Sequence, residues 1–155
     1  MKTLLSFSLT TALLVANASA TTDPFLGQWK LDVQRSHYPA GTCPKEMVIE
    51  MADVKQGIHY HSHTIYADGR TAQAEYVADY KGKQAAVMGT RGFLLPVTLK
   101  RLDARTVVAS YSRGQQVVAT SRRVLSGDGR LMTITTKSRD QSGKNVITVG
   151  VYEKE

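Results

Sequence analysis

The stretch Phe25-Leu26-Gly27-Gln28-Trp29-Lys30-Leu31 decides the fold of this 155-residue chain. It contains the only tryptophan and begins a predicted first strand over residues 25–33. Short runs of strand-forming residues follow it, separated by turns rich in glycine and aspartate, a pattern typical of consecutive β-hairpins. A chain that begins with Gly-x-Trp in a strand and continues in hairpins indicates a small closed β-barrel.

Residues 1–20 have the composition of a secretory signal peptide. Lys2 supplies the positive charge, residues 4–15 form an apolar run, and Ala18-Ser19-Ala20 offers small residues for cleavage. An N-terminal membrane anchor is the alternative, but the apolar run is short for a membrane span. We therefore expect a mature domain over residues 21–155, a periplasmic or secreted location, and no stable membrane insertion after cleavage.

The distribution of charge argues against nucleic-acid binding, and the single cysteine rules out an intramolecular disulfide. The formal net charge is +7, but the basic residues are scattered and form no long run, which favours a solvated surface over nucleic-acid binding. An intramolecular disulfide is impossible because Cys43 is the only cysteine. We expect its thiol to be buried or inert.

The spacing of the turns predicts an all-β, single up-and-down antiparallel β-barrel of 8–10 strands. Residues 34–44 carry two prolines and a glycine, which indicates a loop with one helical turn near residues 34–38. The further strands are predicted at residues 47–52, 58–66, 71–80, 84–88, 93–102, 105–112, 115–125, 131–138 and 145–153.

A β-sandwich is the alternative to a barrel, and three observations favour the barrel. The connections are predicted to be successive tight hairpins, which fits an up-and-down topology. The chain begins and ends in good strands, which can pair and remove the sheet edges. The positions expected to face inward are small or polar, which leaves volume for one ligand in a barrel of this size. These positions are Ala72, Ala74, Ala78, Ser110, Thr133 and Thr135.

Three segments resemble the lipocalin and fatty-acid-binding-protein superfamily, the calycins. The opening stretch resembles its Gly-x-Trp signature, Asp128-Gly129-Arg130-Leu131-Met132-Thr133-Ile134-Thr135 its next-to-last strand, and Val149-Gly150-Val151-Tyr152-Glu153-Lys154 its closing strand. With the export signal, the chain is similar to a bacterial lipocalin-like protein. The resemblance implies a barrel that binds a small hydrophobic or amphipathic molecule.

The resemblance also assigns roles to residues at the ends of the barrel. It places Gly27 and Trp29 at the closed end, with Arg122 or Arg123 from a late strand over the indole. In the fatty-acid-binding branch an arginine two residues before the closing tyrosine clamps a carboxylate, but that position is Gly150 here. Only Tyr152 and Arg122 remain of this clamp, and the loop at residues 34–44 replaces the helical lid.

The residue types suggest a ligand pocket inside the barrel. Tyrosine and methionine suit amphipathic ligands, because they combine apolar surface with a hydroxyl or an adaptable thioether. The alternative is an ordinary barrel core. The predicted ligand-binding residues are Met47, Ile49, Met51, Tyr60, Tyr76, Tyr80, Tyr111, Arg122 and Tyr152.

Three histidines occupy alternate positions of one predicted strand. His59, His61 and His63 share a face, and such imidazoles can ligate zinc or copper. The opposite face carries Ile58 and Tyr60 and is more apolar, which places the histidines in solvent. A polar surface stripe is therefore the alternative to a metal site.

We expect no enzyme activity and no cofactor, since the sequence contains no nucleophile elbow, zinc-protease motif or phosphate loop. The leading hypothesis is an exported lipocalin-like protein that binds a small hydrophobic or amphipathic molecule without covalent chemistry. The alternatives are a metal-handling protein that uses the three histidines and a structural or interaction module of the cell envelope with a filled barrel. A barrel-type isomerase or cyclase is a fourth possibility.

Overall fold

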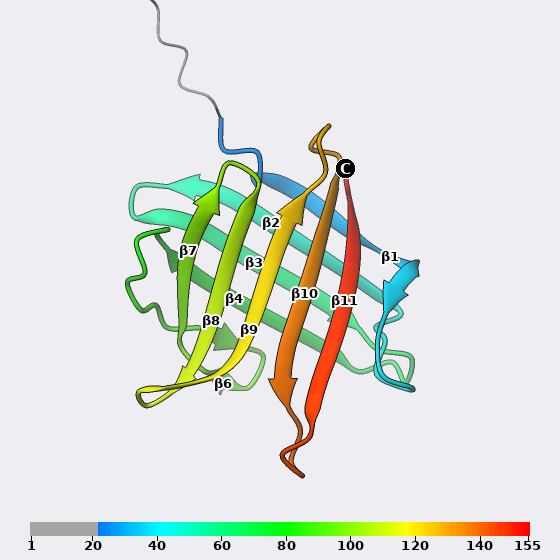
Figure 1. The fold of residues 1–155 in the computed structure, drawn as a ribbon. Helices are drawn as coiled ribbons and strands as arrows, with labels where there is room; N and C mark the ends of the chain where they lie inside the picture. The colour runs from blue at the N-terminus through cyan, green and yellow to red at the C-terminus, as the bar shows by residue number, and fades with distance from the viewer. Residues whose placement is uncertain (1–21) are drawn as a thin grey trace, which may run out of the picture.

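The computed structural model describes residues 22–155, so the predicted signal peptide at residues 1–20 lies outside the described residues. None of the described residues belongs to a helix that could cross a membrane. Eleven strands carry the fold (Figure 1): β1 Gly27–His37, β2 Glu46–Val54, β3 Gly57–Ile65, β4 Thr71–Ala78, β5 Met88–Gly89, β6 Gly92–Phe93, β7 Val97–Asp103, β8 Thr106–Arg113, β9 Gln116–Leu125, β10 Leu131–Arg139 and β11 Asn145–Lys154.

The strands form one antiparallel sheet in the order β6-β5-β4-β3-β2-β1-β11-β10-β9-β8-β7. The first and last strands pair, as the sequence predicted, and Leu31 lies opposite Tyr152. The sheet curls until residues 81–85 meet β7, where Ala85 and Val97 exchange hydrogen bonds of 2.8 and 2.9 Å. The expected all-β, up-and-down barrel is therefore confirmed, with eleven strands in place of eight to ten.

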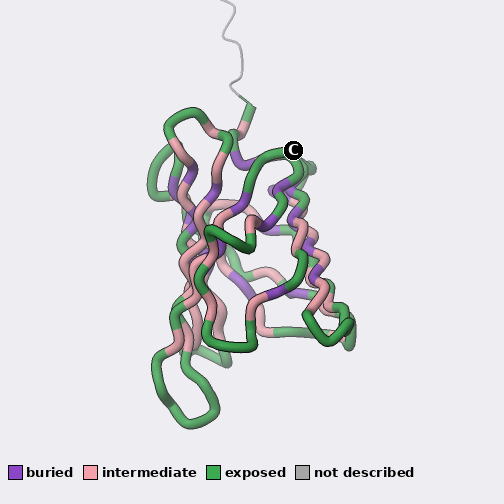
Figure 2. The backbone as a smooth tube through the Cα atoms, turned by 90° about the vertical axis from the view of Figure 1, so that its right-hand side faces the viewer, coloured by how far each residue is buried: buried purple, intermediate pink, exposed green. Residues whose placement is uncertain are grey.

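Figure 1 shows two layers of strands that cross obliquely, β7–β11 in front and β1–β6 behind. We call the end with residues 22–26 and the C-terminus the closed end; it lies at the top of Figure 1. The opposite end, with the loop 38–45 and the turns 66–70, 114–115 and 140–144, is the open end. Buried residues gather mainly toward the closed end, and the turns of the open end are exposed (Figure 2).

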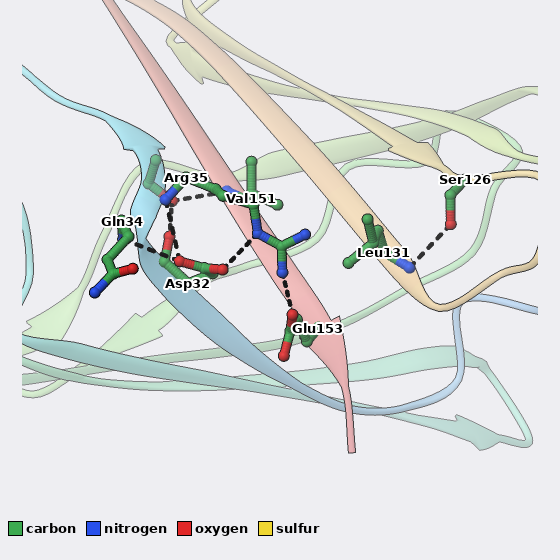
Figure 3. A network of polar contacts seen from close by, with 8 residues as sticks. Asp32, Gln34, Arg35, Ser126, Leu131, Val151 and Glu153 are labelled. Carbon is green, nitrogen blue, oxygen red and sulfur yellow. Dashed lines mark hydrogen bonds and ion pairs between the residues drawn. The ribbon is translucent and has the colours of Figure 1, made fainter.

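The helical turn predicted near residues 34–38 is wrong, because β1 continues through a bulge. The Asp32 carboxylate accepts hydrogen bonds from the amides of Gln34 and Arg35 at 2.9 and 3.0 Å, and Arg35 pairs with Asp32 and Glu153 (Figure 3). Beyond the bulge the Ser36 hydroxyl accepts the amide of Val151 at 2.9 Å. The side chains of Asp32 and Ser36 thus accept hydrogen bonds from the backbone N–H groups that the interrupted β1–β11 pairing leaves without partners. The strand therefore continues to His37.

The strand predicted at residues 93–102 is divided at Pro96. Proline has no N–H to donate to a ladder, so the chain leaves β6 after Phe93 and enters β7 at Val97. The strand predicted at residues 84–88 shrinks to β5, which forms a short hairpin with β6 at the open end. The residues before β5 instead bridge to β7 and close the barrel.

Candidate functional site

The closed end is plugged by aromatic side chains. Phe25 and Trp29 are almost fully buried, and the indole N–H of Trp29 donates to the carbonyl oxygen of Phe25 at 2.9 Å. Asp23 fixes this segment, because its carboxylate pairs with Arg101 at 2.5 Å. The segment just before β1, residues 23–26, is therefore packed against the core.

The cation over the indole is a lysine. Lys154 is opposite Trp29 in the register of β1 and β11, and its Nζ lies 5.1 Å from the indole centroid. The same ammonium donates to the Pro24 carbonyl at 3.1 Å, which ties both chain ends together. The prediction that Arg122 or Arg123 covers Trp29 is wrong, because β11 ends directly beside the indole and β9 lies farther round the sheet.

Arg122 and Arg123 point to opposite sides of β9. Arg122 is exposed on the outer face, so its predicted place in the ligand pocket is also wrong. Arg123 lies inside the barrel with only 3% of its surface exposed. Successive residues of a strand face opposite sides, so a single step in register decides which arginine enters the barrel.

Arg123 is held by aromatic side chains from the opposite layer. Its Nη2 donates to the Tyr76 hydroxyl at 2.7 Å, and the guanidinium carbon lies 4.9 Å from the Tyr60 ring centroid. The Tyr60 and Tyr76 rings are stacked with centroids 4.7 Å apart. The Nη1 group lies 3.9 Å from the Met51 sulfur, and Nε has no hydrogen-bond partner.

No carboxylate neutralises Arg123. All acidic side chains of the chain fall within the described residues, and none of the ion pairs there includes Arg123. Burial raises the pKa of Tyr76, so the phenol that accepts its hydrogen bond is neutral at physiological pH. The barrel therefore contains a desolvated positive charge with a free N–H donor.

Between Arg123 and the open end the inner wall is lined by small side chains. Ser62 and Thr64 of β3 face Ala74 and Ala72 of β4. Ser121 of β9 is also buried, and its hydroxyl lies 2.7 Å from that of Thr136. Ala72, Ala74 and Ala78 face inward as predicted.

The predicted inward orientation of Ser110, Thr133 and Thr135 is wrong. Their neighbours Ala109 and Met132 are fully buried, and adjacent residues of a strand face opposite sides. These three residues therefore lie on the outer face. Of the inward polar residues, Ser62, Ser121 and Thr136 were not predicted. Ser62 shares the two-residue period of Ile58 and Tyr60, and that period could have found it. The residues next to Ser121 and Thr136 are polar, so alternation gives no such signal there.

The pockets at the open end include two large ones. One has a volume of about 620 Å³ and lies between Leu95, Val117, Ala119, Ser138 and Arg139, with further residues from the neighbouring turns. Ala119 and Ser138 lie on the same inner faces of β9 and β10 as Ser121 and Thr136, so the inner end of this pocket lies at the mouth of the barrel. The other, of about 650 Å³, lies between the loop 38–45, the β3–β4 turn and the β5–β6 hairpin.

Gly150 is a glycine because the Tyr152 ring lies across it. A Cβ added at Gly150 would stand 2.7 Å from Cε2 of Tyr152 and 3.0 Å from the Tyr38 hydroxyl. The arginine that the fatty-acid-binding pattern has at this position would collide with that ring. The Tyr152 hydroxyl instead lies 3.3 Å from the sulfur of Met47.

The structure brings most of the predicted ligand-binding residues into one interior cluster. Ile49, Met51, Tyr60, Tyr76 and Tyr152 are buried there, and Met47 and Tyr111 are partly buried at its edge. Tyr80 lies toward the closed end, 4.1 Å from the guanidinium carbon of Arg101. Arg123, predicted only for barrel closure, is the charged member of the cluster.

The histidines lie on the outer face of β3, where each of their inward neighbours is buried. His59 is 3.6 Å from Glu75 and His61 is 3.9 Å from Glu50, on the two flanking strands. No three potential ligand side chains among residues 22–155 are gathered closely enough to hold a metal ion. The described residues thus give the predicted site of His59, His61 and His63 no geometric support.

Cys43 lies in the loop at the open end and is partly buried. It is a free cysteine, as the single cysteine of the sequence requires. Burial raises the pKa of its thiol, which keeps it protonated at neutral pH.

An alkaline titration tests how dry the interior is. Burial raises the pKa of Tyr38, Tyr60, Tyr76, Tyr80 and Tyr152. Their neutral phenols therefore stabilise the fold in full below the unfolded-state pKa of about 10, and this stabilisation is lost as the pH rises above it. We expect their ultraviolet phenolate absorbance to appear together with loss of the β-sheet circular dichroism signal. Smooth titration of all tyrosines near pH 10 in the folded protein would contradict a dry interior.

No protein-family model matches the chain, and neither does any curated protein. Among solved structures it is similar to zebrafish ileal bile acid-binding protein, crystallised in complex with cholic acid. The TM-score is 0.56 at 12% sequence identity, over 85% of this chain and 99% of that chain. At this identity the likeness shows the fold alone, and it agrees with the all-β barrel predicted from the sequence.

Proposed function

We propose that this protein binds a small amphipathic anion inside the barrel, with the acid group at Arg123 and no covalent chemistry. The single observation that carries the proposal is the buried guanidinium without a carboxylate partner. The zebrafish protein of the same fold is a bile acid-binding protein crystallised with cholic acid, which supports a small acid as the ligand class.

Burying a charge is costly unless it is paired and fully hydrogen-bonded. The hydroxyl of Tyr76 and the face of Tyr60 offset part of this cost for Arg123, but its Nε–H remains unsatisfied. A carboxylate or sulfonate brings several acceptor oxygens and can form charge-assisted hydrogen bonds with a guanidinium. An anionic ligand would thus complete the site that the protein leaves incomplete.

The apolar body of the ligand would lie between Arg123 and the open end. The side chains there are small, and the hydroxyls of Ser62, Thr64 and Ser121 can bond polar groups on an otherwise apolar ligand. The ligand would enter at the open end, where the pocket between Leu95 and Arg139 lies. The position of one clamp arginine in the fatty-acid-binding pattern is Gly150 in this chain. The guanidinium of Arg123 would therefore recognise the acid alone.

Binding without catalysis agrees with the chemistry of the cluster. The groups around Arg123 are phenols and a thioether, and burial raises the pKa of Tyr60 and Tyr76. Neutral phenols of this kind are poor general bases at physiological pH. We therefore propose a carrier or binding protein and not a barrel-type isomerase or cyclase.

We also propose that the protein is exported and acts in the periplasm or outside the cell. The support is the sequence of residues 1–20, with Lys2, the apolar run and Ala18-Ser19-Ala20. Determination of the mature N-terminus by mass spectrometry tests this. A first residue at position 21 is expected, and an intact N-terminus on protein recovered from the cytoplasm would contradict it.

Calorimetric titration with three ligands of one chain length tests the proposed ligand class. We expect dodecanoate to bind at least about tenfold more tightly than dodecanol, because a charge-assisted hydrogen bond contributes about 1.5–3 kcal/mol. Dodecyltrimethylammonium should bind more weakly than either. Equal affinities for all three would contradict recognition of the acid, and no binding at all would favour the interaction module with a filled barrel.

A further inference from the structure

The β5–β6 hairpin lies at the open end (Figure 1). It displays apolar side chains in solvent. Phe93 is 79% exposed, Leu94 51% and Met88 39%. Met88 and Phe93 are opposite each other in the register of the hairpin. Among the large hydrophobic residues of the described chain, Phe93 is the most exposed. Clustered exposed hydrophobic residues of this kind mark interaction sites.

The hairpin is held in this orientation by a close contact. A Cβ added at Gly89 would stand 2.8 Å from the Leu94 side chain, so Leu94 packs directly over the glycine. The amide of Leu94 donates to the Val87 carbonyl at 2.8 Å. The structure therefore presents Phe93 to solvent from a fixed backbone.

Basic side chains surround these apolar residues. Arg91 is at the tip of the hairpin, and it lines the pocket of about 650 Å³ together with Arg70 and Leu94. Arg70 is fixed there by Asp68 and lies 5.4 Å from the Tyr66 ring centroid. A pocket with two guanidinium groups suits a phosphate, because each guanidinium can donate two parallel hydrogen bonds to two oxygens of one phosphate group.

The open end as a whole carries more basic than acidic residues, which also suits an anionic partner. Its loops and strand ends carry six basic residues, Lys45, Arg70, Arg91, Arg113, Arg139 and Lys144, against the acids Glu46, Asp68 and Asp140. At the closed end the basic residues Lys55, Lys81, Lys83, Arg105, Arg130 and Lys154 are nearly balanced by Asp23, Asp79, Asp103, Asp128 and Glu155. The formal net charge is thus +3 at the open end, which carries Phe93, and +1 at the closed end.

We propose that the open end docks on an anionic lipid surface. Phe93 and Leu94 insert at the boundary between headgroups and acyl chains, and Arg91 and Arg70 contact lipid phosphates. Apolar insertion combined with attraction of basic residues to anionic headgroups is sufficient for reversible membrane binding. Three apolar side chains on one short hairpin are too few for the core of a stable protein interface, which favours a lipid surface over a protein partner.

Co-sedimentation with vesicles tests this surface independently of the ligand inside the barrel. We expect the purified protein to bind vesicles that contain phosphatidylglycerol at low salt, and to bind pure phosphatidylcholine vesicles far less. Binding should fall as salt screens the charges. Phe93→Ser should reduce the partition coefficient by about tenfold, and Arg91→Gln by about fivefold.

Two matched variants at the closed end control for a general loss of apolar or basic surface. Leu102 is 49% exposed on β7 and Arg105 is exposed in the following turn, so Leu102→Ser and Arg105→Gln should leave vesicle binding unchanged. Phe93→Ser should also leave dodecanoate binding unchanged. Absence of vesicle binding, or equal losses in the open-end and closed-end variants, would overturn the proposal.

Discussion

Replacement of Trp29 by alanine is expected to lower the free energy of unfolding by about 3–5 kcal/mol. The indole is fully buried at the closed end, where it packs with Phe25 and is covered by Lys154. Its removal leaves a cavity at the junction of the first and last strands and an unpaired carbonyl at Phe25. Urea denaturation followed by circular dichroism measures the effect, because the substitution removes the only tryptophan fluorophore.

Two further variants keep this prediction informative if Trp29→Ala does not fold. Trp29→Phe retains a ring but loses the N–H donor, and it should show a smaller loss of stability. Phe93→Ala removes an aromatic ring that is 79% exposed, and its stability should stay within about 0.5 kcal/mol of the original protein. Similar losses for Trp29→Ala and Phe93→Ala would contradict the role of Trp29 as the plug of the closed end.

Replacement of Arg123 by methionine is expected to raise the free energy of unfolding by about 1–3 kcal/mol. A buried charge without a carboxylate destabilises the fold, and methionine fills a similar volume without that cost. The lost hydrogen bond to Tyr76 offsets part of the gain. Urea denaturation of the ligand-free protein measures the difference.

Arg122→Met is the matched control, since it makes the same chemical change one residue away on the outer face. Its effect on stability should be within about 0.5 kcal/mol. A large loss of stability in Arg123→Met would show that the guanidinium supports the fold, and would contradict a charge kept in the barrel for binding.

The architecture was readable from the sequence because its signals are local and repeated. Turns such as Ala67-Asp68-Gly69 end one strand and begin the next, and the alternation of Met47, Ile49 and Met51 marks an inner face. The pairing of β1 with β11 followed from the strand-like ends of the chain. These features depend on backbone chemistry and a two-residue period, which a single sequence displays.

The composition of the site was less predictable because it depends on register and on contacts distant in sequence. Arg122 and Arg123 are neighbours in the chain, and both alternations of β9 contain apolar residues, so pattern alone did not decide which one points inward. The Lys154 ammonium reaches Trp29 only because two chain ends meet. The helical turn expected near residues 34–38 is replaced by a bulge that Asp32 and Ser36 stabilise.

Titration of dodecanoate and dodecanol into the original protein, Arg123→Met and Arg122→Met tests the central claim most directly. We expect the preference for dodecanoate over dodecanol to disappear in Arg123→Met while dodecanol affinity changes little. Arg122→Met should keep the full preference, because its side chain lies outside the barrel. If Arg123→Met retained the preference, or if Arg122→Met lost it equally, recognition of an anion by the buried guanidinium would be contradicted.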